Sequence, residues 1–256
     1  MGSSLNFSKN HDAFLAAQSF AVVSSIMDDG QVWVMSIFGK EGDITALLES
    51  QILISPASIP KHDVLHSAIQ LPGTPLSMLG IDLMKRNHHR INGATTISKC
   101  DATGLHFQVW DYSPNCPKYI NRREIIPSTT PMNKAAIREE HTILTKSDRD
   151  FVQSIDTLWI GSYAPNAGAN VNYRGGTPGF IRVTSDSSIE WPEYRGNGMF
   201  YTSGNLDVND RAGVTLVDFD TGSMIQMTSH VAVDWHFNGE YEGATRLIKF
   251  QLKKLV

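Results

Sequence analysis

The hydrophobic positions of this chain fall into short runs rich in β-branched and aromatic residues, most of them bounded by Gly, Asp or Pro. Such runs are typical of β-strands. In the first half they are residues 19–26, 31–38, 76–83, 90–97 and 105–112, and in the second half 157–163, 179–183, 198–203, 213–219, 224–233 and 245–252. Many short strands with few helices favour a mainly β, α+β protein built on antiparallel β-barrels over an alternating parallel sheet.

Two stretches predict short helices instead. Residues 11–18 form the first, and residues 146–155 form the second, with Ser147 as its N-cap and acidic residues in its first turn. Each half of the chain therefore begins with a helix and continues with strands.

The chain also repeats itself. Residues 14–44 align without a gap on residues 151–181, which places Gly42 on Gly179 and keeps the apolar pattern. A fixed order and spacing over a segment of this length indicates an internal duplication, and a duplicated unit changes the whole prediction of fold.

A second pair of segments, 79–94 and 215–230, aligns in the same order. We therefore expect two copies of one unit, over residues 1–125 and 146–256. Residues 126–145 carry prolines and mixed charge, and we place the linker between the units there.

Composition places the chain among ordinary globular proteins. Its 256 residues are 41% hydrophobic and 19% charged, and no apolar run approaches the roughly 18 residues of a membrane span. The net charge of -4 predicts no general attraction to nucleic acid, although Lys and Arg residues can still gather around an anionic ligand. The N-terminal residues do not resemble a secretion signal, and Cys100 and Cys116 are too few for a disulfide framework. We expect a cytoplasmic protein with no membrane partner.

Candidate chemistry appears in residues 200–219, FYTSGNLDVNDRAGVTLVDF. The hydroxyls of Thr202 and Ser203 precede a glycine, and Arg211 follows after a loop. Hydroxyls, backbone amides and a guanidinium are the groups that bind a phosphate oxyanion. The same composition is also typical of a polar hairpin turn. The residues by themselves leave both interpretations open.

Residues 179–233 resemble the flavin-binding split barrel of pyridoxamine 5'-phosphate oxidase and its relatives. The shared order is a strand ending in a basic residue, a Phe-Tyr-Thr segment, an Asn-x-Arg turn and a strand carrying Gln226. The stretches 79–94 and 115–124, the latter beginning Asn-Cys-Pro-Lys-Tyr-Ile, resemble the two-barrel, flavin-nucleotide-binding subgroup of that family. The resemblance implies two tandem FMN-binding split barrels that form an internal pseudo-dimer.

The resemblance also implies a set of residues around FMN. Arg182, Tyr201, Thr202 and Ser203 would contact the phosphate, with Arg174 and Arg211 as neighbouring candidates, Gln226 would face the isoalloxazine ring, and Asn115, Lys118 and Tyr119 would close the site from the first half. Removing Arg182 is then expected to abolish flavin binding in a folded protein.

The chain departs from the family pattern at two places. Asn205 and Leu206 stand where the oxidase has an Arg-Lys pair, so phosphate affinity is either weaker or supplied by other cations such as Lys118 or Arg211. Residues 51–60 of the first half offer no counterpart to the Tyr-Thr-Ser cluster. We expect one flavin per chain at most.

Three functions are compatible with these residues and with the resemblance. The first is an FMN-dependent oxidoreductase in which a small organic substrate or a reduced nicotinamide exchanges hydride with the flavin, and the sequence identifies no catalytic acid or base. The second is a non-catalytic protein that binds or stores flavin or haem, with His230 as an axial ligand. The third is a ligand-free scaffold. Pyridoxamine phosphate oxidation itself is not expected, because the C-terminal residues lack the family's substrate-closing arrangement.

Other groups of residues give weaker indications of function. His88 and His89 are adjacent in a strand or in the approach to one, so their side chains point to opposite faces and cannot share a metal ion. His62 and His66 have helical spacing but no convincing third ligand follows. We expect no metal site. A homodimer of such chains stays open.

Overall fold

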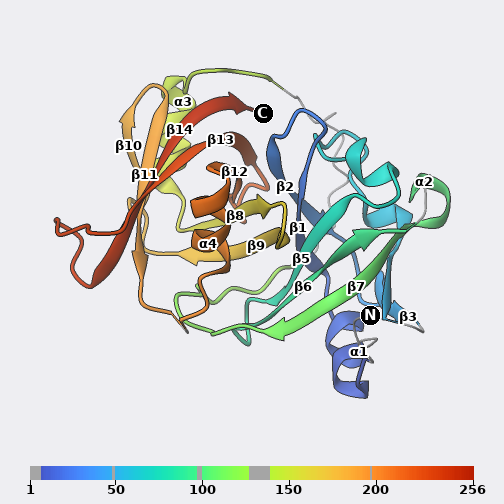
Figure 1. Cartoon of the computed structure of the whole chain (residues 1–256). Helices are drawn as coiled ribbons and strands as arrows, with labels where there is room; N and C mark the ends of the chain where they lie inside the picture. The colour runs from blue at the N-terminus through green and yellow to red at the C-terminus, as the bar shows by residue number, and fades with distance from the viewer. Residues whose placement is uncertain (1–6, 48–49, 97–99, 127–138, 197) are drawn as a thin grey trace.

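Two seven-stranded antiparallel sheets form the framework of the computed structural model (Figure 1), which describes residues 7–47, 50–96, 100–126, 139–196 and 198–256. The first sheet has the order β2-β1-β5-β6-β7-β4-β3. Its strands are β1 Phe20–Ile26, β2 Val32–Phe38, β3 Ile44–Leu47, β4 Gln51–Ile54, β5 Pro75–Asp82, β6 Asn87–Thr95 and β7 Leu105–Pro114. Three short helical segments accompany this sheet, η1 Pro56–Ser58, η2 Ala68–Gln70 and α2 Cys100–Thr103.

The second sheet has the order β9-β8-β12-β13-β14-β11-β10. Its strands are β8 Thr157–Ala164, β9 Gly168–Gly175, β10 Arg182–Ser185, β11 Ser188–Tyr194, β12 Arg211–Val217, β13 Met224–Asp234 and β14 Ala244–Leu255. Strand by strand, this order equals that of the first sheet. Helix α1, Lys9–Ala16, precedes β1 as helix α3, Lys146–Ser154, precedes β8. The duplication predicted from the sequence is thus confirmed in the topology.

Strand register makes the equivalence of the two halves specific. Leu79 pairs with Arg90 between β5 and β6, as Thr215 pairs with Gln226 between β12 and β13. Arg90 and Gln226 therefore occupy corresponding positions in the two units. Gly42 and Gly179, aligned in the sequence, share a left-handed backbone with φ of 88° and 90°.

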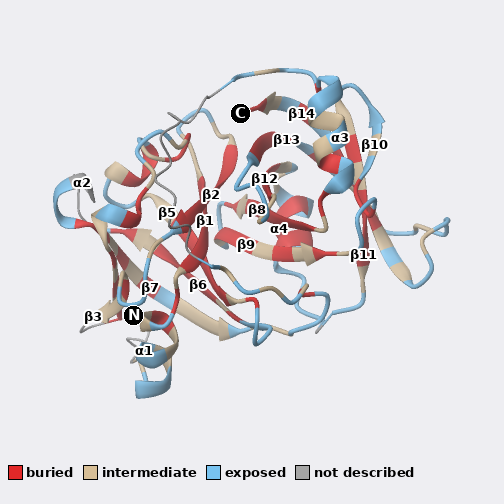
Figure 2. Cartoon of the chain, turned by 180° about the vertical axis from the view of Figure 1, so that it is seen from behind, coloured by how far each residue is buried: buried red, intermediate tan, exposed pale blue. Residues whose placement is uncertain are grey.

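Three hydrophobic clusters hold the chain together. One fills the first barrel, with Met35, Ile52 and Phe107 among its members, and one fills the second barrel around Trp191 and Phe250. The third lies between the barrels and draws on both, through Phe20, Val22, Val34, Leu79, Ile81, Leu83, Ile120, Trp159, Val171, Tyr173 and Val217. Figure 2 shows buried stretches of β1, β2, β8 and β9 in the middle of the molecule. The two units therefore pack as an internal pseudo-dimer.

Backbones approach closely where the barrels meet. A Cβ added to Gly213 on β12 would lie 2.4 Å from the carbonyl oxygen of Val32 on β2. Thr215 donates a hydrogen bond to the Val34 carbonyl at 2.5 Å, and Ser77 accepts one from the Val171 amide at 3.1 Å. Glycine is required at position 213 because no side chain fits there.

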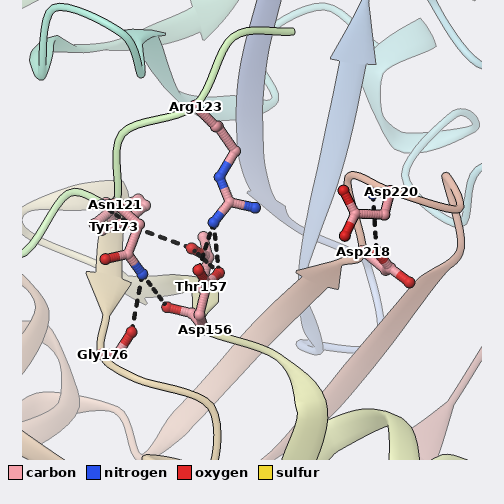
Figure 3. A network of polar contacts seen from close by, with 8 residues as sticks. All are labelled: Asn121, Arg123, Asp156, Thr157, Tyr173, Gly176, Asp218 and Asp220. Carbon is pink, nitrogen blue, oxygen red and sulfur yellow. Dashed lines mark hydrogen bonds and ion pairs between the residues drawn. The ribbon is translucent and has the colours of Figure 1, made fainter.

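The segment that follows β7 leaves the first barrel and lies against the second (Figure 3). The side-chain amide of Asn121 donates to the carbonyls of Asp156 and Gly176, each at 2.9 Å, and its backbone amide donates to the Tyr173 hydroxyl at 3.0 Å. Arg123 forms an ion pair with Asp156 at 2.5 Å. These contacts fix residues 115–126 in place.

The last residues of the predicted linker, 126–145, pack on the second unit beside its C-terminal strand β14. Residues 127–138 lie outside the described residues. His141 already bridges to Leu255 on the second sheet, and Leu144 is buried in the second core. Among the described residues, no helix has both the length and the apolar character needed to cross a membrane.

Most predicted strands are confirmed, but one prediction is wrong in type. Residues 198–203 were expected to form a strand, and the chain instead forms helix α4, Tyr201–Val208. Leu206 is buried in the second core, and the Asn205 amide donates to the Gly168 carbonyl at 3.2 Å. Tertiary contacts override the strand preference of the Phe-Tyr-Thr sequence. The N-cap of α3 is Thr145, not Ser147, because Thr145 and Asp148 form a capping box.

Candidate functional site

A cavity of about 560 Å³ lies between the two barrels. Strand β6 and the segment after β7 line it from the first barrel, and β9, β11, the start of α4 and β14 line it from the second. The lining residues that carry polar chemistry are His88, Arg90, Asn115, Cys116, Lys118, Tyr119, Asn172, Arg174, Glu193, Arg195, Thr202, Ser203, Thr245 and Arg246. Both units contribute, so the cavity is complete only when the barrels are paired.

Helix α4 presents its first turn to this cavity. Thr202 and Ser203 lie in that turn, and the first intrahelical bond runs from the Gly204 amide to the Phe200 carbonyl. The first backbone amides of a helix have no intrahelical acceptor. Within the described part of the chain, no side chain caps α4 at Phe200 to accept from them. Asn172 donates to the Thr202 hydroxyl at 2.7 Å, which leaves the Thr202 proton free to be donated. A helix start of this kind attracts an anion.

Positive charge gathers around the same space. Among the described lining residues, the cations are Arg90, Lys118, Arg174, Arg195 and Arg246, against the single carboxylate of Glu193. The chain as a whole has a net charge of -4, so the cavity lining is positive in a protein that is negative overall. A cavity with such a lining favours an anionic ligand.

Glu193 organises two of these cations. It is 5% exposed, and its carboxylate forms an ion pair with Arg174 and lies 4.0 Å from a guanidinium nitrogen of Arg246. Burial lowers the pKa of Arg246, with the charge of Glu193 acting in the opposite direction. One carboxylate offsets only one of these two charges, and Arg90, Lys118 and Arg195 add further positive charge to the lining.

Arg90 reaches from the first barrel into the second. Its guanidinium donates to the Ser113 hydroxyl at 2.9 Å and to the Asn172 side-chain oxygen at 3.4 Å, and it lies 3.7 Å from the centre of the Tyr201 ring. Burial lowers the pKa of Arg90, while Tyr201 and Asp111 raise it. Guanidinium groups stay charged at neutral pH, so a buried cation faces the start of α4.

His88 lies two residues before Arg90 on the same face of β6. It is 5% exposed, and its Nε2 lies 3.0 Å from the Cys116 carbonyl oxygen. Burial lowers the pKa of His88 to about 4, with neighbouring cations acting in the same direction. The imidazole is therefore neutral at pH 7. His89 points to the other face, where its ring stacks on Phe14, as the strand alternation predicts.

Tyr119 closes the rim of the cavity. Its hydroxyl donates to the Arg195 carbonyl at 3.0 Å, and its backbone has a φ of 68°, unusual for a bulky residue. A Cβ on Gly175 would lie 2.2 Å from the Tyr119 carbonyl oxygen. Gly175 thus allows the segment from the first barrel to lie directly on β9.

The structure brings six residues of the sequence-derived set together. Asn115, Lys118, Tyr119, Arg174, Thr202 and Ser203 all line the cavity. Tyr201 lies beside it, with its ring beneath Arg90. Residues 205–206, where the family pattern has Arg-Lys, anchor α4 to the second barrel.

Three residues of that set lie elsewhere. Arg182 is on β10 and pairs with Glu240 at 2.9 Å beside the Tyr241 ring. Arg211 donates to the carbonyl of Asp29 in the turn between β1 and β2 at 3.4 Å. Neither side chain lines the cavity.

Gln226 is the third. It is buried between the barrels and donates to the Val34 carbonyl at 2.6 Å and to the Asp63 carboxylate at 2.9 Å. Because Gln226 corresponds to Arg90 in the other unit, it marks the pseudo-symmetric position. At this position Gln226 bonds to Val34 and Asp63, and none of these three residues lines the cavity that contains Arg90.

Sequence reasoning missed much of the cavity lining, including Arg90, His88, Glu193 and Arg246. Arg90 and His88 are two residues apart and share one face of β6, and this strand spacing was the available signal. Glu193 and Arg246 lie on β11 and β14, which pair with each other, and only the sheet order brings them to β9. His230, considered as a haem ligand, pairs with Asp210 at 3.0 Å and does not line the cavity.

No family model and no curated protein matches this chain. Solved structures similar to it include a putative pyridoxamine 5'-phosphate oxidase from Lactobacillus delbrueckii, at 10% identity and a TM-score of 0.38 over 45% of this chain and 95% of the other. An FMN-binding protein from Syntrophomonas wolfei matches at 15% identity and a TM-score of 0.30 over 42% of this chain and 81% of its own.

HutZ, the haem storage protein from Vibrio cholerae, matches at 12% identity and a TM-score of 0.31 over 44% of this chain and 93% of its own. Each match covers less than half of this chain and most of the other protein. At these identities and TM-scores the matches say nothing about ligand or reaction.

Proposed function

We propose that this chain binds one FMN in the cavity between its barrels and acts as an FMN-dependent oxidoreductase. The observation that carries the proposal is the start of α4. There Thr202 and Ser203, with backbone amides that lack intrahelical acceptors, face a cavity lined by five cations among the described residues. This is the set of groups that a phosphate monoester needs.

The cavity also fits FMN in size and in the character of its walls. Its volume of about 560 Å³ lies within the range of about 300 to 1,000 Å³ that holds small organic ligands. Aromatic side chains of Tyr119, Tyr194 and Phe200 line it together with the polar groups. A ring system and a phosphate are both accommodated by such a lining.

Buried polar atoms support the presence of a ligand. The Nδ1 atom of His88, both side-chain amide atoms of Asn115 and the Nε atoms of Arg90 and Arg246 are buried and have no hydrogen-bond partner among the described residues. Buried polar groups are nearly always bonded in folded proteins, because an unbonded one costs about 1 to 3 kcal/mol. Their gathering around one cavity supports the proposal that a polar ligand bonds to them.

Each part of the site then has a role. The first turn of α4, with Thr202 and Ser203, holds the phosphate, and Arg90 and Lys118 neutralise its charge. Glu193 keeps Arg174 and Arg246 in place at the wall of the cavity. Tyr119 excludes water at the rim. When bound, FMN supplies hydride and electron transfer, and the chain's own residues bind it, orient it and shield it.

The two other functions have less support. For haem, the described lining residues offer His88 as their one imidazole, and the Nε2 of that ring is already bonded to the Cys116 carbonyl. For a ligand-free scaffold, the unbonded buried atoms and the unbalanced charge of the cavity have no explanation. The oxidoreductase assignment rests on the sequence resemblance and on the cavity together, and the substrate is a small organic molecule or a reduced nicotinamide.

The first test is the absorption spectrum of the purified chain, with mass analysis of any chromophore released by heat. Flavin bands and a released flavin carrying one phosphate support the proposal, and a haem Soret band overturns it in favour of the haem alternative. A colourless protein that also fails to bind added FMN overturns the proposal. Bleaching of bound flavin under anaerobic conditions by reduced nicotinamide, or by candidate organic substrates, then tests the oxidoreductase part.

A further inference from the structure

We infer that His88 and Asn115 bind the imide edge of the flavin ring, with the Nδ1 atom of His88 accepting the hydrogen bond from the flavin N3–H group. The inference rests on the proposed function, because it assigns the ring end of the same ligand. It adds His88, a residue to which the family resemblance gave no role, and it makes the site selective for ligands with an N–H donor at that edge.

The tautomer of His88 follows from its surroundings. A carbonyl oxygen only accepts hydrogen bonds, so the contact of 3.0 Å between Nε2 and the Cys116 carbonyl requires the proton to be on Nε2. Burial lowers the pKa of His88 and keeps the ring neutral at pH 7. Nδ1 therefore carries a lone pair. That atom is buried without a partner among the described residues, on a ring that lines the cavity.

Asn115 is directly beside His88. Its backbone amide donates to the His88 carbonyl at 2.9 Å, which continues the β6–β7 pairing by one step beyond His89 and Pro114. The side-chain nitrogen and oxygen of Asn115 are both buried and have no partner among the described residues. The pair thus offers one acceptor on His88 together with a donor and a further acceptor on Asn115.

This set is complementary to an imide. The edge of the flavin pyrimidine ring presents a carbonyl, an N–H and a second carbonyl in a row. His88 Nδ1 accepts from the N–H, and the Asn115 side-chain nitrogen donates to a neighbouring carbonyl. A cation in place of His88 could not accept this bond, and the low pKa of the ring keeps it available as an acceptor.

The experiment compares FMN with 3-methyl-FMN, in which a methyl group replaces the N3 hydrogen. Dissociation constants are measured by flavin fluorescence for the wild-type chain, for His88→Leu and for His89→Leu. His89 is the matched control, because the same substitution is made at the adjacent residue on the opposite face of β6. Thermal unfolding of each variant checks the fold.

We expect the wild-type chain to bind FMN at least about tenfold more tightly than 3-methyl-FMN, since one hydrogen bond and a close contact distinguish them. His88→Leu should lose most of this discrimination, and His89→Leu should keep it. Equal binding of the two flavins by the wild-type chain overturns the inference and leaves the flavin site standing, and this comparison needs no variant to fold.

Discrimination that persists in His88→Leu also overturns the inference, because it would arise from crowding at N3 and not from the acceptor. If the wild-type chain binds neither flavin, the proposed function fails, and the assignment of the ring edge fails with it. The two failures are therefore distinguishable.

Discussion

Arg90 and Tyr201 join the two barrels at the cavity, with the guanidinium carbon of Arg90 3.7 Å from the centre of the Tyr201 ring. Arg90 comes from β6 of the first unit, and Tyr201 is the first residue of α4 in the second. The contact places a buried cation at the start of the helix that carries Thr202 and Ser203. Neither barrel forms this arrangement by itself, so the cavity depends on residues of both units.

Lys118→Ala should weaken FMN binding about tenfold, because one charge-assisted hydrogen bond to the phosphate is lost. Lys118 is exposed, so thermal stability should stay unchanged. Arg182→Ala is the matched control. It removes an exposed cation that pairs with Glu240 outside the cavity, and FMN affinity should stay unchanged. Titration with FMN measures the affinity of both variants. If Arg182→Ala lost affinity and Lys118→Ala did not, the phosphate would lie near β10 instead.

Thr202→Val should weaken FMN binding about fivefold, because it removes a hydroxyl from the first turn of α4 and keeps the shape of the side chain. Thr184→Val, on an exposed strand of the second sheet away from the cavity, is the control. Equilibrium dialysis with FMN measures the effect. An unchanged affinity in Thr202→Val would remove the α4 start as the phosphate site.

The stability of the ligand-free chain should depend on His88 in acid. The pKa of His88 is lowered from 6.5 to about 4 in the folded chain, so below pH 6.5 the unfolded chain takes up a proton that the folded chain does not. The free energy of unfolding therefore falls as the pH falls through this window. The loss is on the order of 3 kcal/mol between pH 7 and pH 4.

His88→Gln removes this contribution and retains a donor for the Cys116 carbonyl. Urea unfolding of both chains at pH 7 and pH 4 measures the difference. The wild-type chain should lose more stability than the variant over this range. Parallel losses would show that His88 titrates normally in the folded chain.

Gly213→Ala should destabilise the chain by about 1 to 3 kcal/mol, because the added methyl group meets the Val32 backbone of the opposite barrel. Gly204→Ala is the control, since a Cβ at this exposed helical position meets nothing within 4 Å. It should stabilise α4 by up to about 1 kcal/mol. Thermal unfolding compares the two, and equal effects would contradict the close packing of β12 on β2.

Local pattern and duplication predicted much of the fold. Short runs rich in β-branched and aromatic residues indicated most strands, and the alignment of Gly42 with Gly179 indicated a repeat that the sheet order confirms. The pattern failed at residues 198–203, where a strand was predicted and helix α4 begins instead, because Leu206 and Asn205 find partners in the second barrel. No local signal reports such long-range contacts.

The candidate site was predictable in part. Motif resemblance pointed to Thr202, Ser203 and Lys118, which do line one cavity, because these residues lie close to the segments that define the motifs. It did not indicate Arg90 or Glu193, whose roles depend on how the barrels pack. For Gln226 the resemblance predicted a place facing the flavin ring, but the packing of the barrels buries it against Val34 and Asp63.

We propose that the cavity between the barrels binds a flavin through its phosphate. Parallel titrations of the wild-type chain with FMN and with riboflavin, which lacks the phosphate, measure how much of the binding depends on that group. We predict one FMN per chain, bound at least about a hundredfold more tightly than riboflavin, since several charge-assisted hydrogen bonds depend on the phosphate. Equal affinity for the two flavins, or binding of neither, would contradict the claim.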